Sequence, residues 1–183
     1  KEKFFLLIEA TYSNTRYSNL KHILNNNKVE NILLEKMIFS KVSSFENFER
    51  YFQKNILNTY VNVWSNSLFK MIDLDKKKLN EVSISVTVPK GDLITNMIHY
   101  IYLFILMTNN KSLSFNTSKL DKKYFSSKRN GFHEISGKFE ISNKKGKIIL
   151  KTQKKINSHI LNIQTEKEKF RINILRDGNI NIF

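Results

Sequence analysis

Two residues of this 183-residue chain have the type and the setting needed to move protons. Lys36 follows Glu35 at the end of an apolar segment, and open α/β sheets bind ligands where buried parallel strands end. A partly buried lysine has a lowered pKa suited to proton transfer, whereas a solvated strand-end lysine has no such role. His99 follows the Gly91-Asp92 turn, and its imidazole is either an acid–base group or a hydrogen-bonded core residue.

The remaining histidines and nucleophiles form no further chemical signature. No two histidines stand at metal-binding helical spacing, and cysteine is absent, so the sequence contains no zinc motif. It also has no nucleophile elbow and no P-loop. His133 and His159 fall in alternating segments, where we expect an ordinary structural role.

The first 60-odd residues predict a parallel β-α-β-α-β unit. Apolar segments predict strands at 4–10, 29–35 and 59–64, the first buried on both of its faces. Helical spacing predicts helices at 17–25 and 43–55. The apolar face of the second helix would consist of Phe45, Phe48, Phe52 and Ile56. This order of elements is typical of a doubly wound sheet.

The rest of the chain predicts alternating strands and one long apolar helix. A strand at 82–88 and a turn at 89–92 lead into a helix at 94–107. Further strands are predicted at 112–115, 132–141, 147–152, 159–164, 170–175 and 179–183. The expected fold is α/β followed by α+β: a partial Rossmann-like unit at 1–63, then at 64–183 a mostly antiparallel open sheet, a meander with one main helix packed on it.

The net charge of +15 raises the possibility of a nucleic-acid partner. Arginine, which binds guanine and phosphate in a fork, is scarce, and the lysines are scattered, mostly at turns. We therefore do not expect nucleic acid as a partner. The longest apolar stretch, 97–107, is shorter than the about 20 residues that cross a bilayer. No signal-peptide cleavage site follows the N-terminal apolar run, so we expect a soluble, cytoplasmic protein without membrane contact.

The order of these features resembles the Gfo/Idh/MocA family of oxidoreductases. Its members join an N-terminal Rossmann domain to an α/β domain with an open antiparallel sheet. Leu34-Glu35-Lys36 resembles the family's Glu-Lys-Pro motif, and the segment 91–99 resembles the turn and helix that end in the catalytic histidine. The resemblance extends to 8–11 with Asn14 and Arg16, to 60–63, and to 128–137.

The resemblance implies hydride transfer between NAD or NADP and a hydroxyl group of a sugar, inositol or related small molecule. His99 would take or give the hydroxyl proton, and Lys36 would orient the substrate oxygen. By the same resemblance, cofactor contacts would come from Thr11, Asn14, Arg16, Glu35 and Lys36, and substrate contacts from Thr95 and Asn96.

The sequence also departs from the family pattern. Met37 replaces the motif proline, and Thr95 and Tyr102 stand where the family has aspartates. The first β-α-β unit with its G-x-G-x-x-G loop is absent, so we expect a truncated or degenerate copy. The sequence does not decide whether this chain catalyses the reaction without that unit. The alternatives are a non-catalytic interaction protein that forms a homo-oligomer through its open sheet and, third, a basic nucleic-acid binder.

Overall fold

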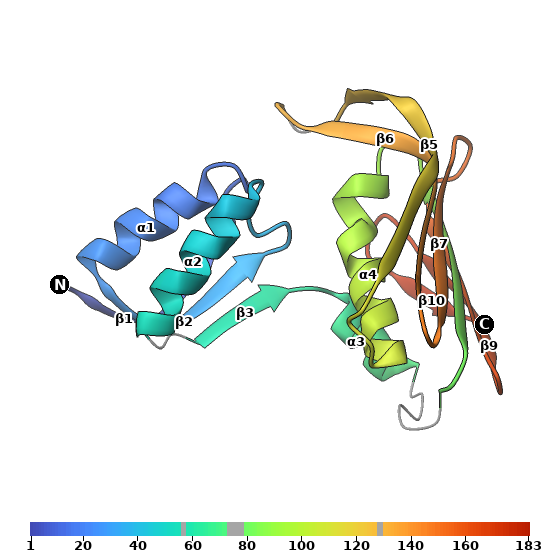
Figure 1. Cartoon of the computed structure of the whole chain (residues 1–183), viewed down its shortest axis with the longest axis horizontal. Coiled ribbons are helices and arrows are strands. Elements are labelled where there is room, and N and C mark those ends of the chain that lie inside the picture. The colour runs from blue at the N-terminus through green and yellow to red at the C-terminus, as the bar shows by residue number, and fades with distance from the viewer. Residues whose placement is uncertain (56–57, 73–78, 128–129) are drawn as a thin grey trace. The chain divides into compact units, whose positions relative to one another are not determined.

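The computed structural model describes residues 1–55, 58–72, 79–127 and 130–183. The chain divides into two compact units, Lys1–Val63 and Trp64–Phe183, and each has its own hydrophobic core (Figure 1). The Phe52 side chain and Ile56, expected on a helix face, lie outside the described residues, as do 73–78 and 128–129.

The first unit is a three-stranded parallel sheet covered on one face by two helices. Its strands are β1 (Lys3–Glu9), β2 (Lys28–Glu35) and β3 (Asn58–Asn62), in the order β1-β2-β3. They are connected by α1 (Arg16–Asn26) and α2 (Val42–Asn55). Right-handed crossovers that always step in the same direction place both helices on the same face, as Figure 1 shows. The predicted β-α-β-α-β unit is confirmed.

The core of the first unit lies between this helical layer and the middle strand. Leu20 and Leu24 of α1 pack with Ile32 and Leu34 of β2, and Phe39 completes the cluster. Phe48 of α2 packs against it from the second helix. The unit is therefore held together by one apolar layer.

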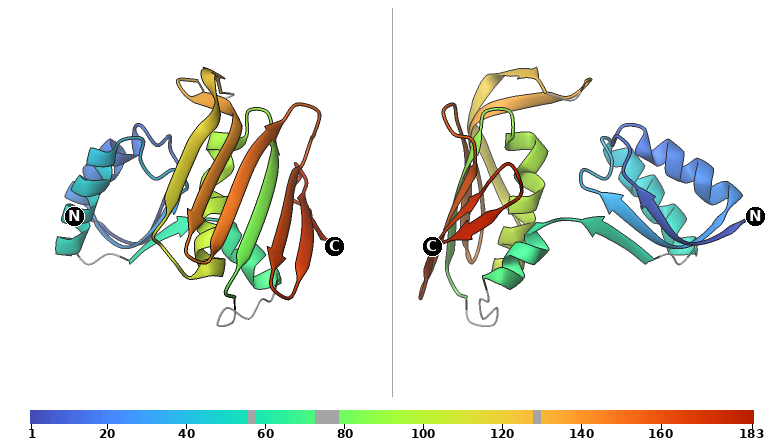
Figure 2. Two further views of the ribbon diagram at one scale, coloured as in Figure 1. Left: turned by 45° about the vertical axis from the view of Figure 1, so that its right-hand side comes forward. Right: turned by 180° about the vertical axis from the view of Figure 1, so that it is seen from behind.

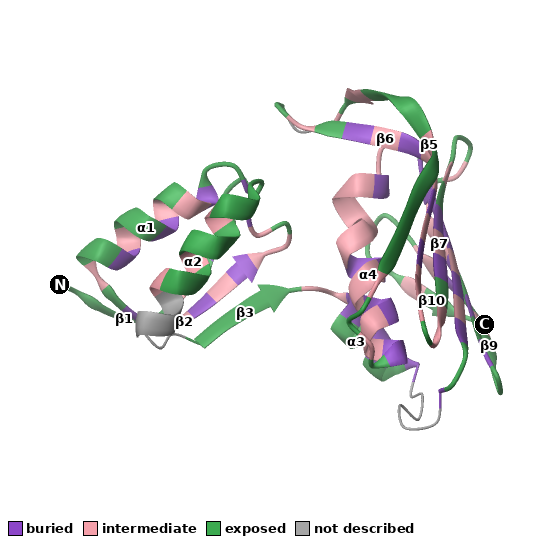
Figure 3. Cartoon of the chain, viewed as in Figure 1, coloured by how far each residue is buried: buried purple, intermediate pink, exposed green. Residues whose placement is uncertain are grey.

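The expectation that β1 is buried on both faces is wrong. Leu6 is 46% exposed and Ile8 is 62% exposed. Figure 3 shows β3 largely exposed as well. Because α1 and α2 cover the same face, no element of this unit among the described residues covers the other one. An apolar run identifies a strand suited to burial, but the layers of the fold decide whether it is buried.

The second unit is a seven-stranded sheet with two helices. Its strands are β4 (Val82–Pro89), β5 (Ser114–Ser126), β6 (His133–Asn143), β7 (Gly146–Gln153), β8 (His159–Thr165), β9 (Lys169–Ile174) and β10 (Ile180–Ile182). Its helices are α3 (Ser65–Met71) and α4 (Leu93–Thr108), which lie on the same face of the sheet (Figure 2). The predicted α/β then α+β fold class is confirmed.

The predicted antiparallel meander is wrong in the position of β4. The strand order is β10-β9-β8-β4-β7-β6-β5, so β4 lies between β7 and β8. It pairs parallel with β7 and antiparallel with β8. Val82, Ile84, Val86 and Val88 of β4 are all buried in the core. The most apolar strand occupies the centre of the sheet, where α4 and neighbouring strands cover it most completely.

Two further boundaries differ from the prediction. The third strand ends at Asn62, and Trp64 begins the unpredicted α3 as its N-cap residue. The strand predicted at 112–115 instead runs from Ser114 to Ser126. Most of its residues are exposed at the edge of the sheet. Both faces of this strand therefore carry polar residues, and the sequence shows no alternation of apolar and polar residues that would predict it.

Candidate functional site

The carboxyl ends of the parallel strands gather the predicted cofactor residues of the first unit. Glu35 ends β2 and pairs in register with Asn62, which ends β3. Asn62 Nδ2 donates a hydrogen bond to Glu35 Oε1 at 2.7 Å, and the backbone N–H of Lys36 lies 3.2 Å from Glu35 Oε2. Sequence reasoning missed Asn62 as a site residue, although its place at the end of the third strand was a usable signal.

Arg16 fixes the loops at this edge of the sheet. Its Nη1 donates to the carbonyl oxygens of Glu35 at 2.7 Å, Met37 at 3.0 Å and Ile38 at 3.1 Å, and its Nη2 donates to that of Thr11. Arg16 is only 3% exposed. Its guanidinium therefore holds the backbone on both sides of Lys36, rather than presenting donors at the surface.

The backbone after Lys36 has an unusual conformation. Met37 has a φ of 54°, in the left-handed region that costs a non-glycine residue about 1–2 kcal/mol. The carbonyl group of Met37 is one of the acceptors of Arg16, which stabilises this turn. Lys36 itself is half-buried, between a strand end and a strained residue. Such strain is concentrated at functional sites.

The other predicted cofactor residues lie in the loop after β1. The Thr11 hydroxyl donates to the buried carboxylate of Glu9 and accepts from Asn19 Nδ2 at 3.1 Å. Asn14 is exposed in the same loop. The structure thus brings Thr11, Arg16, Glu35 and Lys36 to one edge, with their backbones joined through Arg16.

In the second unit, His99 lies on α4 but is only 2% exposed. Its ring packs against that of Trp64, with centroids 4.7 Å apart and planes inclined by 33°. A proton-transfer group needs a path to its substrate. In this geometry the Trp64 indole lies against the imidazole and restricts such a path.

Thr95 and Asn96 lie in the first turn of α4, where hydrogen bonds hold both side chains in place. Glu134 Oε1 accepts the backbone N–H of Thr95 at 3.0 Å and also its hydroxyl, while Glu134 Oε2 accepts the N–H of Ile94 at 2.9 Å. Asn96 Nδ2 donates to the carbonyl oxygen of Asp92 at 3.1 Å. The buried Glu134 carboxylate therefore caps α4. Nothing in the sequence joins it to Thr95.

A partly buried network missed by sequence reasoning lies one turn further on. The hydroxyl of Tyr100 is hydrogen-bonded to His159 Nδ1, and His159 Nε2 lies 3.4 Å from Asp92 Oδ2. Because a carboxylate only accepts, Nε2 is the donor toward Asp92. His159, assigned an ordinary structural role, thus links β8, α4 and the turn before α4.

The described residues contain no cluster of three or more histidine or acidic side chains that could hold a metal ion. Within the same ranges, no helix is long and apolar enough to cross a membrane.

Several solved structures have a similar fold. The dehydrogenase MviM from Clostridium difficile is 18% identical to this chain, with a TM-score of 0.66. The match covers 97% of this chain and 62% of the MviM chain. A candidate NADPH-dependent oxidoreductase from Desulfitobacterium hafniense is 12% identical with a TM-score of 0.70, over 93% and 55%. A super-repressor mutant of Gal80p from Saccharomyces cerevisiae is 11% identical with a TM-score of 0.63, over 98% and 61%.

No protein-family model matches the chain, and no curated protein matches it. The chain spans 62% of MviM and 55% of the Desulfitobacterium protein. At these sequence identities the likeness shows the fold alone. By that fold, the chain is similar to proteins named as a dehydrogenase, an oxidoreductase and a super-repressor mutant of Gal80p.

Proposed function

We propose that this chain is part of a Gfo/Idh/MocA-type oxidoreductase that moves a hydride between NAD or NADP and a hydroxyl group of a sugar-like substrate. The observation that carries the proposal is the set of hydrogen bonds by which Arg16 holds the backbone on both sides of Lys36, at the carboxyl edge of a parallel sheet. Open α/β sheets bind their ligands at this edge. The likeness in fold to named dehydrogenases supports it.

The residues of the first unit fit one part of such a cofactor. Partly exposed polar groups at the carboxyl edge, Lys36 and Glu35 with Asn62, suit a nicotinamide and its ribose. Residues 1–63 include no glycine, so they contain no glycine-rich turn for a pyrophosphate. We therefore infer that a segment other than these residues would hold the pyrophosphate.

The bare face of β1 supports the presence of such a segment in the working protein. Ile8, Leu33 and Tyr60 pair in register across the three strands and form an apolar row on the face that the helices leave uncovered. The sheet order leaves β1 at one edge. A further parallel β-α-β unit carrying the phosphate loop would cover this row and extend the sheet.

Each proposed catalytic residue has one task. A bound nicotinamide accepts or donates the hydride. Lys36 donates a hydrogen bond to the substrate oxygen and stabilises its developing negative charge. His99 takes or gives the hydroxyl proton, which requires the Trp64 ring to move away from it. Thr95 and Asn96 lie one turn before His99 and would contact the substrate.

Titration with reduced nicotinamide mononucleotide, which has no pyrophosphate, tests the cofactor part of this proposal. We expect backbone amide NMR shifts at Lys36, Met37 and Asn62, and we expect NADH to bind no more tightly. Lys36→Ala should abolish the shifts, whereas Lys41→Ala, at an exposed position in the same unit, should keep them. No shift at this edge up to about 1 mM ligand, a binding free energy of about −4 kcal/mol, would overturn the proposal for this chain.

A second candidate is a non-catalytic interaction protein with the same fold. The burial of His99 behind Trp64 favours it, because a covered imidazole cannot reach a substrate. If this candidate is right, His99→Gln would leave binding to the partner protein unchanged. If the chain is an oxidoreductase, His99→Gln would abolish hydride transfer.

A further inference from the structure

Sulfur is scarce in this chain, and two of its sulfur-containing side chains are exposed. Cysteine is absent, and all 4 methionines lie in the described residues. Met97 and Met107 are on α4, where Met107 is 1% exposed and Met97 packs against the core. Met71, at the end of α3, is 53% exposed, and Met37 is 38% exposed. An oxidant in solution therefore meets two thioethers, one in each unit.

The backbone around Met37 keeps its side chain at the surface. Met37 has a φ of 54°, and its carbonyl group accepts a hydrogen bond from Arg16 Nη1. The carbonyl groups of Glu35 and Ile38 accept hydrogen bonds from the same atom. Because these bonds fix the chain before and after Met37, its side chain cannot turn into the core unless some of them break.

Met37 lies at the candidate site, whereas Met71 belongs to the other unit. Met37 follows Lys36 directly, and Lys36 follows Glu35, whose carboxylate accepts from Asn62 Nδ2 at 2.7 Å. A chemical change at the Met37 sulfur therefore acts next to the residue that we expect to donate a hydrogen bond to the substrate.

We propose that Met37 is a site of reversible oxidation and that its sulfoxide blocks the candidate site by accepting a hydrogen bond from the Lys36 ammonium group. The effect on ligand binding rests on the function proposed above. The ammonium group has three donors and no acceptor, and a thioether is only a weak acceptor. Oxidation converts the thioether into a polar sulfoxide, whose oxygen competes with the substrate for Lys36.

The oxidant is a peroxide. A lone pair of the Met37 sulfur attacks one peroxide oxygen, an S–O bond forms and the O–O bond breaks. The second oxygen takes the proton of the first and leaves as water when the oxidant is hydrogen peroxide. The sulfur loses two electrons and the peroxide gains them. Methionine sulfoxide reductases reverse the change, with one enzyme for each sulfoxide epimer.

Two leucine variants form a matched pair for the test. Met71→Leu leaves Met37 as the exposed methionine, and Met37→Leu leaves Met71. After hydrogen peroxide is added and then removed, mass spectrometry should find one added oxygen at Met37 well before Met107. The NMR signal of the Lys36 ammonium group should shift in oxidised Met71→Leu. Its affinity for reduced nicotinamide mononucleotide should fall about tenfold, as for the loss of one hydrogen bond to a charged group.

Sulfoxide reductases should restore both the signal and the affinity in Met71→Leu. Treated Met37→Leu should show neither change.

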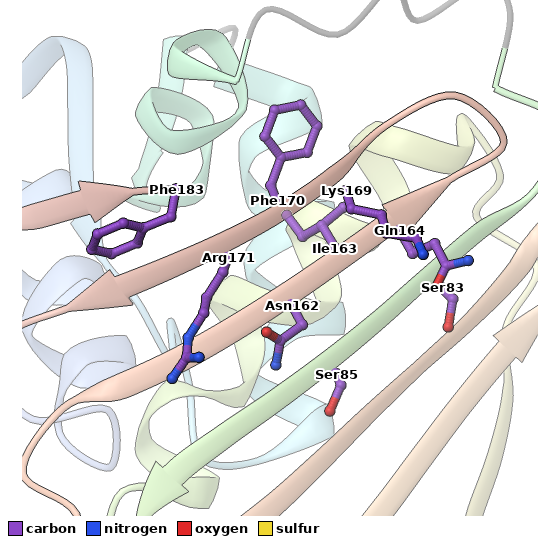
Figure 4. A pocket seen from close by; sticks show the side chains of 9 residues that line it. All are labelled: Ser83, Ser85, Asn162, Ile163, Gln164, Lys169, Phe170, Arg171 and Phe183. Atoms are coloured by element: carbon purple, nitrogen blue, oxygen red, sulfur yellow. The ribbon is translucent and has the colours of Figure 1, made fainter.

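The seven-stranded sheet supplies an internal reference. A groove on its outer face, opposite α4, is lined by residues of β4, β8 and β9 together with Phe183, and none of these lining residues contains sulfur. Figure 4 shows Asn162 and Arg171 on adjacent strands in this groove. Their amide signals should stay in place when Met37 is oxidised. Shifts there as large as the shift at Lys36 would overturn the proposal in favour of general damage.

Other results would also overturn the proposal. If Met37 is oxidised as slowly as Met107, its thioether is not accessible. If Met37 is oxidised and the Lys36 ammonium signal does not move, the sulfoxide does not bind Lys36. Equal losses of affinity in the two treated variants would assign the loss to another residue.

Failure of this inference is distinguishable from failure of the proposed function. If untreated Met71→Leu does not bind the mononucleotide, the proposed function fails, and the Lys36 ammonium signal alone decides the inference. If it binds equally well before and after oxidation, the proposed function stands and this inference is wrong.

Discussion

Arg16 Nη1 donates to the carbonyl oxygen of Glu35 at 2.7 Å and so ties the first helix to the end of the second strand. The same guanidinium holds Met37, whose φ of 54° lies in the left-handed region. A single buried side chain therefore determines the path of the backbone around Lys36. This relationship makes Arg16 a positioning residue for the candidate site, whereas the family resemblance implied a cofactor contact for it.

Arg16→Gln should destabilise the first unit. The change leaves carbonyl groups in the Thr11 and Met37 loops without their donor, and we expect a loss of about 3 kcal/mol. Hydrogen exchange of the β1 and β2 amides measures it. Arg50→Gln, which removes an exposed arginine 3.9 Å from Glu46, is the control and should cost less than about 0.5 kcal/mol. Equal protection in the two variants would contradict this role of Arg16.

Glu134→Ala should destabilise the second unit through the start of α4. It removes the acceptor of the Ile94 and Thr95 N–H groups, which is expected to cost about 1–2 kcal/mol. Urea unfolding followed by Trp64 fluorescence measures it. Glu140→Ala on the outer face of the same strand is the control, with an expected change within about 0.5 kcal/mol. If both variants unfolded alike, Glu134 would not be a cap.

Tyr100 should make the second unit sensitive to alkaline pH. Burial, with the charge of Asp92 second, raises the pKa of Tyr100 well above its usual 10.0. The unfolded chain loses this proton near pH 10 and the folded chain keeps it. The stabilisation is therefore complete below about pH 10 and is lost as the pH rises further.

Urea unfolding between about pH 8 and about pH 11 measures this dependence. Tyr100→Phe should lower stability at neutral pH by about 1 kcal/mol, because His159 loses a hydrogen bond, and should flatten the alkaline decline. Tyr12→Phe, at an exposed position, should retain the decline. An unchanged decline in Tyr100→Phe would assign it to other groups.

Gly146→Ala should disrupt the pairing of β7 with β4. A Cβ atom at Gly146 would overlap the carbonyl group of Val82, so the strands must separate, at a cost of about 3 kcal/mol. Gly178→Ala is the matched control, because its φ of +88° is also strained but no heavy atom lies within 4 Å. We expect it to cost only about 1 kcal/mol in thermal or urea unfolding. Similar losses of stability in the two variants would show that backbone strain, and not the overlap with Val82, causes the destabilisation.

Local patterns were sufficient to predict most elements. The apolar segments of the first unit and the helical spacing between them predicted its order of strands and helices, because these depend on residues a few positions apart. The same holds for the Pro89–Asp92 turn, where Gly91 has a φ of 95° and Asp92 N–H bonds to the Pro89 carbonyl group. α3 was missed because its seven residues are too few to show a period.

Local sequence patterns were enough to predict the fold class and the polar residues at the ends of the first unit's strands. Which residues share a site depends on how the elements pack together. Glu134 reaches Thr95 across 39 positions, and His159 reaches Tyr100 across 59. The register of a sheet and the packing of a helix on it bring such residues together. Neither depends on local spacing, because both result from the burial of the whole core.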